Sequence, residues 1–174
     1  EILTDHAWCE QKAASNAISI IARFPEHLEL VEEMTRIAQE EIEHFGMVVE
    51  RIKARGYALG PERKDDYVGE VLKFIRRKCS REEQLVDRLL FAAMIEARSC
   101  ERFKMLSEKI SDPELAEFYR ELMVSEAGHY TTFIGFARKY GTGVDVDLII
   151  GRTAGAHVSP VAEGRSQPLS TGQD

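Results

Sequence analysis

The sequence contains the pattern Glu-x-x-His twice, at Glu41 to His44 and at Glu126 to His129. Each copy lies in the middle of a long stretch whose apolar residues recur every three or four positions, the spacing of one helix face. On a helix, the Glu and the His of each copy lie one turn apart on the same face. A single copy is most often a solvated surface pair. Two copies on two apolar faces instead predict helices that bury a polar site between them.

The composition favours a single all-α domain. The chain has 174 residues, of which 44% are hydrophobic, enough for one good core. Proline and glycine are sparse, no run of β-branched residues alternates, and long stretches are rich in Glu, Ala, Leu, Arg and Lys. The net charge of −7 repels nucleic acid, so a polyanion would have to bind at a local basic patch.

The cysteines argue against a disulfide framework or a thiolate metal site, because Cys9, Cys79 and Cys100 are odd in number and include no Cys-x-x-Cys pair. A reducing, cytoplasmic location fits best. No apolar run has the length of a membrane span, and no signal peptide is visible. Because the chain begins at Glu1 inside a helical pattern and without Met, we expect that an N-terminal segment precedes it.

Four long helices are predicted from the periodicity. The first covers about residues 3–24 and the second about 26–55. Pro25 lies at the turn between them, where its fixed φ and missing donor suit a first helical position, and Gly56 terminates the second helix. A capping box over residues 80–83 opens the third. Asp112 followed by Pro113 marks the start of the fourth, which ends at Gly141. The apolar faces of these helices carry six polar residues: Glu10, Glu41, His44, Glu96, Glu126 and His129.

The chain between and after these helices completes the predicted architecture. A shorter amphipathic helix over about residues 67–79 would cross from the first antiparallel hairpin to the second. We therefore predict a ferritin-like four-helix bundle with a crossover helix, formed by residues 1–141. Residues 142–174 form a C-terminal extension with a short apolar patch at 144–150. From residue 151 the composition is rich in Gly, Ser, Pro and Thr without periodicity, which predicts a flexible tail.

Folding each pair of helices back on itself brings polar residues to the same height. In the first hairpin Glu10 faces Glu41, and in the second Glu96 faces Glu126. The sequence thus predicts a duplicated hairpin, each copy of which supplies half of the polar site. Glu101 is the alternative to Glu96, because Cys100 and Glu101 echo the Cys-Glu pair at residues 9–10. However, Glu101 lies about 140° from the apolar stripe on an ideal helix, so we prefer Glu96.

Four carboxylates in one small core would repel one another and lose solvation unless cations neutralise them. Two divalent ions balance four carboxylates, and each imidazole can complete one metal. Oxygen ligands with a minority of imidazole suit iron or manganese. This arrangement, a Glu from each of two helices and a Glu-x-x-His from each of the other two, is the pattern of di-iron carboxylate bundles.

A basic cluster near the end of the crossover segment is the first candidate for a contact with a phosphate backbone. A run of this kind is most often simply a solvated face. The cluster consists of Lys73, Arg76, Arg77, Lys78 and Arg81.

The run DHAWCEQKAA at residues 5–14, joined to the two Glu-x-x-His patterns, resembles the MiaE-type tRNA hydroxylases of the ferritin-like superfamily. The resemblance covers about residues 1–141. It implies hydroxylation of the isopentenyl side chain of a methylthiolated adenosine next to the tRNA anticodon, using O2 and a non-haem di-iron centre. It also implies that the six polar residues named above on the apolar helix faces are the iron ligands. The segment that usually precedes this motif in the family is not part of this sequence, and the tail after Gly141 lacks the further helical pattern expected of the family.

The leading hypothesis is therefore a di-iron monooxygenase that acts on tRNA as a monomer or small homo-oligomer, away from membranes. It would need an external electron donor of the ferredoxin or reductase type. Alternatives on the same scaffold are an iron-storage or ferroxidase protein and a quinone hydroxylase. A helical interaction module without enzymatic activity is a further alternative.

Overall fold

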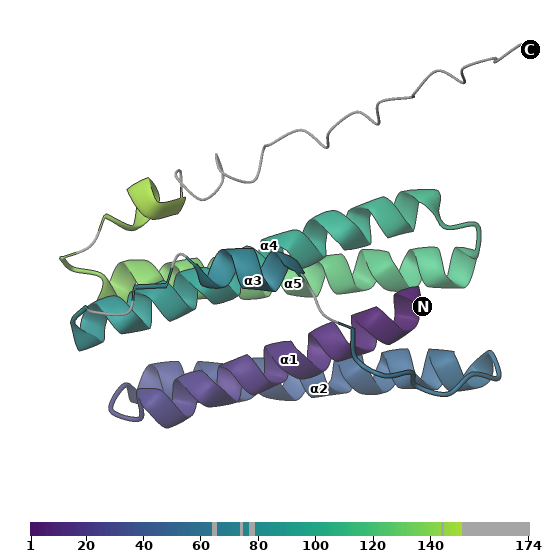
Figure 1. The fold of residues 1–174 in the computed structure, drawn as a ribbon, viewed down its shortest axis with the longest axis horizontal. Coiled ribbons are helices and arrows are strands. Elements are labelled where there is room, and N and C mark those ends of the chain that lie inside the picture. The colour runs from purple at the N-terminus through teal and green to yellow at the C-terminus, as the bar shows by residue number, and fades with distance from the viewer. Residues whose placement is uncertain (64–65, 74, 77–78, 144, 151–174) are drawn as a thin grey trace, which may run out of the picture. The chain divides into compact units, whose positions relative to one another are not determined.

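The fold is described from a computed structural model, which covers residues 1–63, 66–73, 75–76, 79–143 and 145–150. These residues contain helices and no strand, which confirms the all-α prediction. The helices are α1 (Ile2–Arg23), α2 (Leu28–Ala54), α3 (Asp66–Leu72), α4 (Arg81–Lys109) and α5 (Pro113–Tyr140) (Figure 1).

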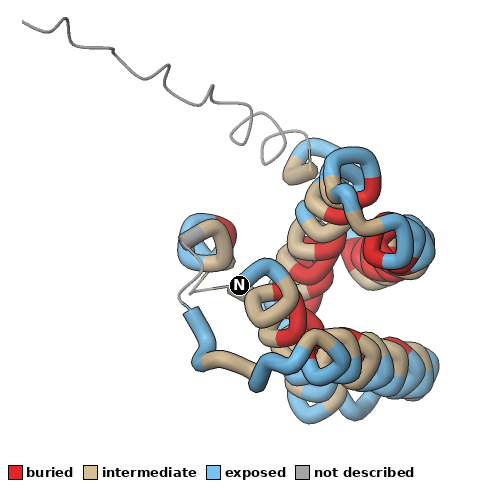
Figure 2. Tube along the Cα trace, turned by 90° about the vertical axis from the view of Figure 1, so that its right-hand side faces the viewer, coloured by how far each residue is buried: buried red, intermediate tan, exposed pale blue. Residues whose placement is uncertain are grey.

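The four long helices form two antiparallel hairpins, α1 with α2 and α4 with α5. The hairpins approach each other through α1 and α4 and through α2 and α5. Buried residues lie on the sides of the helices that face one another, as Figure 2 shows. The predicted four-helix bundle of two hairpins is confirmed, and the two Glu-x-x-His helices, α2 and α5, are neighbours within it.

The chain separates into two compact units, Glu1–Val144 and Asp145–Asp174. The first unit contains the bundle. In the second, residues 146–150 form a short helical segment whose start is capped by the Asp145 Oδ1, 2.9 Å from the backbone N of Leu148. The predicted flexible tail, residues 151–174, lies outside the described residues.

Local sequence signals set most helix ends as expected. The Ser80 hydroxyl accepts a hydrogen bond from the backbone N–H of Glu83 (3.1 Å), and the Glu83 carboxylate accepts one from Ser80 N–H (2.8 Å). This is the predicted capping box. The Asp112 carboxylate caps α5, whose first residue is Pro113. Gly56 follows α2 with φ +77°, a left-handed conformation that glycine adopts without a steric cost.

Two predicted helix boundaries were wrong. The second helix was predicted to begin at about residue 26 but begins at Leu28, because residues 24–27 form a turn closed by a 3.2 Å hydrogen bond from His27 N–H to the Phe24 carbonyl, and Pro25 lies in this turn as predicted. The crossover helix was predicted to reach residue 79 but ends at Leu72. Beyond it, Asp87 on α4 accepts a hydrogen bond from the backbone N–H of Arg76 (2.9 Å). A tertiary acceptor thus replaces the helical carbonyl that a continuing helix would supply.

Candidate metal centre

The six polar residues that the apolar stripes carry meet in the middle of the bundle. α1 supplies Glu10, α2 supplies Glu41 and His44, α4 supplies Glu96, and α5 supplies Glu126 and His129. Five of the six are buried, with residue exposures between 0% and 3%, and His44 is partly buried. Every long helix therefore contributes to a single buried cluster of acid and imidazole groups.

Within this cluster, possible ligand atoms form two overlapping groups, in each of which the atoms lie within 4.8 Å of one another. One group takes atoms from Glu10, Glu41, His44 and Glu126. The other takes atoms from Glu41, Glu96, Glu126 and His129. Glu41 and Glu126 belong to both groups, so the carboxylates of the two Glu-x-x-His motifs lie between the other possible ligands of the cluster.

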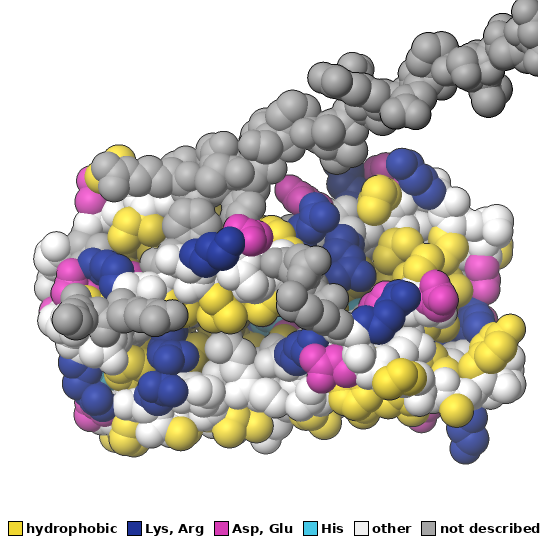
Figure 3. All heavy atoms as spheres, in the orientation of Figure 1, with side chains coloured by type: hydrophobic (Ala, Val, Ile, Leu, Met, Phe, Trp, Pro, Cys, Tyr) yellow, Lys and Arg dark blue, Asp and Glu magenta, His cyan; other side chains and the backbone are white. Residues whose placement is uncertain are grey.

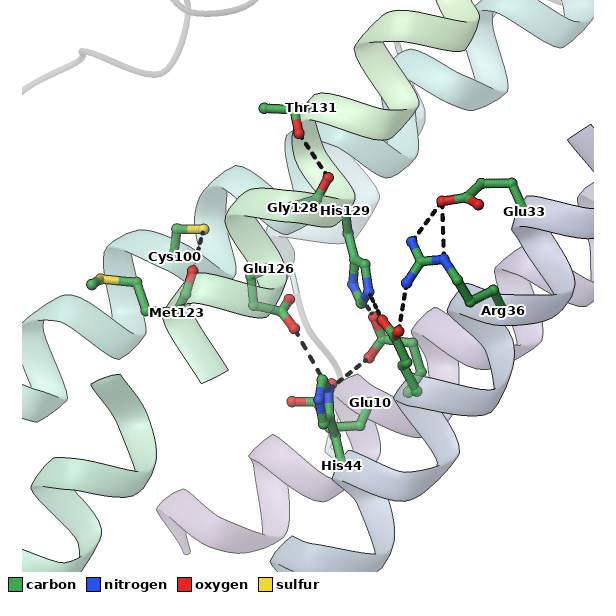
Figure 4. A network of polar contacts seen from close by, with 12 residues as sticks. Glu10, Glu33, Arg36, His44, Cys100, Met123, Glu126, Gly128, His129 and Thr131 are labelled. Carbon is green, nitrogen blue, oxygen red and sulfur yellow. Dashed lines mark hydrogen bonds and ion pairs between the residues drawn. The ribbon is translucent and has the colours of Figure 1, made fainter. Parts of the chain in front are cut away.

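The polar atoms at the centre of the cluster are not satisfied by one another. His129 Nδ1 lies 2.8 Å from Glu41 Oε1, and His44 Nδ1 lies 3.7 Å from Glu41 Oε2 and 3.9 Å from Glu126 Oε1. None of these atoms has a hydrogen bond of acceptable alignment, although all are buried. Figure 4 shows Glu126 and His44 pointing toward each other from facing helices. Buried polar atoms without partners are rare and costly, and cations held between them would satisfy them, so this donor set fits two metal ions.

The pKa values of the cluster residues also favour a site that binds cations. Burial and the neighbouring carboxylates raise the pKa of Glu10 and of Glu96 well above the usual value, and burial raises the pKa of Glu126. Glu41 differs: although burial opposes ionisation, the adjacent imidazoles of His129 and His44 lower its pKa to about 2. Without metal, these glutamates therefore hold protons more readily than free carboxyl groups do, and metal ions would replace those protons.

A carboxylate outside the predicted set orients His129. The Nε2 of His129 lies 2.8 Å from Glu40 Oε2, and Glu40 is bound by Arg36, which also pairs with Glu33 (Figure 4). A carboxylate on the second ring nitrogen is the usual partner of a metal-binding histidine. The periodicity could not identify Glu40 because it lies one position off the apolar stripe. Its adjacency to the motif residue Glu41 was the available signal.

His6 lies beside Glu10, as Glu40 lies beside His129, and orients a residue of the cluster. Its Nε2 contacts Glu10 Oε1, and its ring packs among Phe103, Phe118 and Tyr119, with centroids 4.7, 6.0 and 5.4 Å away. Burial lowers the pKa of His6 to about 3, so its imidazole is neutral. A neutral imidazole can donate one N–H to Glu10 and so fix the direction of that carboxyl group.

The alternative residue Glu101 lies on the outside of the bundle. Its side chain is 71% exposed and pairs with Arg98 at 3.0 Å. Glu96, five residues earlier, lies inside the cluster. The helical phase argument therefore identified which of the two acidic residues points inward.

The basic cluster predicted to contact nucleic acid is engaged with acidic side chains where it can be described. Lys73 pairs with Glu70 (2.6 Å), and Arg81 pairs with Glu26 (2.6 Å). Arg76 binds both Asp87 (2.7 Å) and Glu83 (2.6 Å). The other two predicted residues, Arg77 and Lys78, lie outside the described residues. Contact of this cluster with nucleic acid stays a prediction.

Known proteins are similar to this chain in sequence and in fold. The family described as tRNA-(MS[2]IO[6]A)-hydroxylase (MiaE) matches residues 1–157. A protein of Pseudomonas putida named tRNA 2-(methylsulfanyl)-N(6)-isopentenyladenosine(37) hydroxylase is 41% identical over 145 residues, covering 83% of this chain and 69% of that protein. A protein of the same name from Salmonella typhimurium is 33% identical over 133 residues, covering 70% of this chain and 48% of that protein.

A solved structure gives the matching fold. It is named Protein 43 with aldehyde deformylating oxygenase activity, from Synechococcus, and it superposes with a TM-score of 0.78 at 36% identity. The match covers 87% of this chain and 73% of that structure. Among the helices described for this chain, none combines the length and apolar character that crossing a membrane requires.

Proposed function

The chain belongs to the MiaE family of tRNA hydroxylases, and from this membership we propose that it is a non-haem di-iron monooxygenase. Its substrate would be a methylthiolated, isopentenylated adenosine in tRNA, hydroxylated on the isopentenyl group. The observation that carries the proposal is the pair of overlapping ligand groups that share Glu41 and Glu126 in the core of the bundle.

The ligand assignment follows from the two groups. Glu10 and His44 would hold one iron ion, and Glu96 and His129 the other, while Glu41 and Glu126 belong to both groups and would be available to either ion. Four carboxylates neutralise two divalent ions, which removes the repulsion that raises the pKa values of the buried glutamates. Carboxylate and imidazole ligands suit iron.

When bound, the two iron ions would supply the reductive activation of O2. Hydroxylation inserts one oxygen atom into a C–H bond and releases the other as water, which consumes two electrons and two protons. We assign the electrons to an external donor of the ferredoxin or reductase type. The activity on tRNA would be cytoplasmic, and the protein a monomer or a small homo-oligomer.

The chain's own residues would position the ligands and exclude water. Glu40 orients the His129 ring, and His6 orients the Glu10 carboxyl group. One turn from the ligands, Ile37, Leu122 and Phe133 are buried on the same helix faces. An apolar surround of this kind keeps solvent from the reacting centre and suits an apolar substrate group.

The test is hydroxylation of defined tRNA by the purified, iron-loaded protein with a reductant and O2. Isopentenylated tRNA should yield a nucleoside heavier by one oxygen atom, which takes its label from 18O2. The matched control is tRNA that lacks the isopentenyl group, which should be unchanged. An iron-loaded protein that fails to add oxygen to the isopentenylated tRNA would contradict the proposal.

A ferroxidase or iron-storage role is the second candidate, because a buried acidic di-metal cluster could also oxidise iron(II). Storage requires an oligomer that encloses a cavity. Size measurement in solution separates the two functions, because a monomer or dimer cannot form such a cage.

A further inference from the structure

A cavity of about 90 Å³ reaches the acidic cluster from the side on which α1 and α4 face each other. Three of the six cluster residues, Glu10, Glu96 and Glu126, contribute to its lining, and Tyr67 and Val68 of α3 form part of its wall. The Tyr67 hydroxyl donates a hydrogen bond to the Met94 carbonyl at 3.3 Å, which joins α3 to α4. The cavity therefore connects the buried site with a face of the bundle beside the crossover helix.

A difference between the two halves of the duplicated hairpin explains the position of this cavity. In α1, the residue one turn before Glu10 is His6, whose buried ring fills the space beside the carboxyl group. In α4, the residue one turn before Glu96 is Ala92, which lines the cavity. A methyl group thus occupies the position that corresponds to an imidazole, and space is left next to Glu96.

Apart from the three glutamates of the cluster, the wall of the cavity is mainly apolar and also carries three cations. Ala13, Phe91, Ala92 and Ile95 supply apolar surface. Lys12, Arg98 and Arg102 also line the cavity and bring three positive charges to it. Figure 3 shows this face of the bundle, with Lys and Arg side chains along the strip where the two hairpins face each other.

The three cations differ in how firmly they are held. Lys12 pairs with Glu62 (2.7 Å), and Arg98 pairs with Glu101 (3.0 Å), in both cases between side chains that are at least 38% exposed. Exposed pairs of this kind contribute little and exchange readily for another anion. Arg102 is partly buried, lies 3.8 Å from Cys9 Sγ through Nη1, and has no carboxylate within ion-pair distance among the residues described. Its guanidinium is thus available for an anion.

We propose that this cavity is the entrance for the isopentenyl side chain, and that Arg102, assisted by Lys12 and Arg98, binds a tRNA phosphate at its mouth. The inference rests on the proposed function. An apolar arm attached to a polyanion is the chemistry that an apolar cavity with a cationic rim recognises. A free hydrocarbon or a quinone would use the apolar wall but would gain nothing from the cations. The rim also supplies local positive charge in a protein whose net charge is −7.

The first experiment measures binding of an anticodon stem-loop that carries the isopentenylated adenosine, by fluorescence anisotropy at several salt concentrations. Arg102→Gln should weaken binding by about tenfold and reduce the slope of log K against log salt by about one, as expected for one lost phosphate contact. Arg102→Lys should recover part of the affinity. The matched control is Arg120→Gln on α5, an exposed arginine paired with Glu117 that does not line the cavity.

The second experiment blocks the cavity. Ala13→Phe, and independently Ser99→Leu, should keep the iron content and the helical circular dichroism of the wild type but lose hydroxylation of the stem-loop. Both positions line the cavity and neither is fully buried, so a larger side chain can be accommodated without disrupting the core. Arg102→Gln should lose about tenfold more activity on the stem-loop than on the free modified nucleoside, which lacks phosphate.

The outcomes separate the inference from the proposed function. If wild-type protein hydroxylates the stem-loop while Arg102→Gln binds it with unchanged affinity and salt slope, the phosphate site is wrong and the function stands. If both folded, iron-loaded blocking variants hydroxylate at the wild-type rate, the cavity is not the entrance. If iron-loaded wild-type protein neither binds nor hydroxylates the stem-loop, the proposed function fails, and the inference fails with it.

Discussion

Glu40 on α2 binds the outer nitrogen of His129 on α5, with Oε2 2.8 Å from Nε2, and so connects the two hairpins at the cluster. The other ring nitrogen, Nδ1, lies 2.8 Å from Glu41 Oε1. Because Glu40 accepts the Nε2 proton, the lone pair of a neutral His129 would be on Nδ1, which faces the cluster. The adjacent carboxylates of Glu41 and Glu40 raise the pKa of His129 to about 9 against the effect of burial, so a metal ion would have to displace a proton there.

Replacing Glu40 tests this orienting role. Glu40→Ala should weaken metal binding by about 10- to 100-fold, because partners of ligating histidines have effects of that size. Glu40→Gln keeps an oxygen acceptor and should lose less. Metal affinity is measured by competition with a chromophoric chelator. Glu43→Ala, an exposed position on the same helix, serves as the control, and equal affinities for Glu40→Ala and Glu43→Ala would refute the role.

Glu96 and Glu101 form a matched pair for testing the ligand on α4. Glu96→Ala should lower the iron content per chain after loading, because it removes a buried carboxylate from one of the two ligand groups. Glu101→Ala should retain the wild-type iron content, because that side chain is 71% exposed. Iron per folded chain is measured by elemental analysis. Retention of both metals by Glu96→Ala would remove it from the ligand set.

The dependence of stability on pH should distinguish metal-free from metal-loaded protein. Folded-state pKa values of Glu10, Glu96 and Glu126 are raised, so protonation favours the folded state and stability falls as pH rises above the unfolded value of about 4.5. The pKa of His129, raised from 6.5 to about 9, also makes stability fall as pH rises between these two values. The lowered pKa values of Glu41 (about 2) and His6 (about 3) act in the opposite direction, but only below the unfolded values of about 4.5 and 6.5, so the test is made above pH 6.5.

We therefore expect the Tm of metal-free protein to fall between pH 6.5 and pH 8, measured by circular dichroism in a chelator. Metal ions replace the protons, so metal-loaded protein should show a smaller fall over the same range. Metal binding at pH 7 should also release protons into weak buffer. A metal-free Tm that rises across this range would show that the buried carboxylates do not control it.

The sequence was sufficient for those features that depend on helical phase alone. A period of 3.6 residues puts Glu10, Glu41, Glu96 and Glu126 on apolar faces, and the folding of each hairpin brings them to one height. Features that depend on the distance between helices could not be predicted from helical phase. The Glu40 contact with His129 joins residues 89 positions apart on different hairpins. The cavity depends on how closely α1 and α4 approach, and the short α3 depends on the tertiary acceptor Asp87.

His6 should matter both for stability and for the site. His6→Ala removes a buried ring from contact with three aromatic residues and leaves Glu10 without its partner, so the metal-free protein should lose about 3 kcal/mol in urea unfolding. Metal affinity should fall as well. His6→Gln, which retains an N–H donor, should recover part of the affinity. His27→Ala, at the α1–α2 turn, provides a histidine control that should leave metal affinity unchanged.

Arg76 tests the sequence-based prediction of a nucleic-acid contact against the ion pairs that the structure describes. Its guanidinium binds Asp87, whose side chain is only 5% exposed, and Asp87 also accepts the Arg76 backbone N–H. Arg76→Gln should therefore reduce stability by about 1–3 kcal/mol, the cost of leaving a buried acceptor poorly satisfied. Its effect on stem-loop binding should be smaller than that of Arg102→Gln, because Arg76 already has two carboxylate partners. Urea unfolding and anisotropy on the same variants measure both quantities. A loss of tRNA affinity and of salt slope without a loss of stability would instead support Arg76 as a phosphate contact.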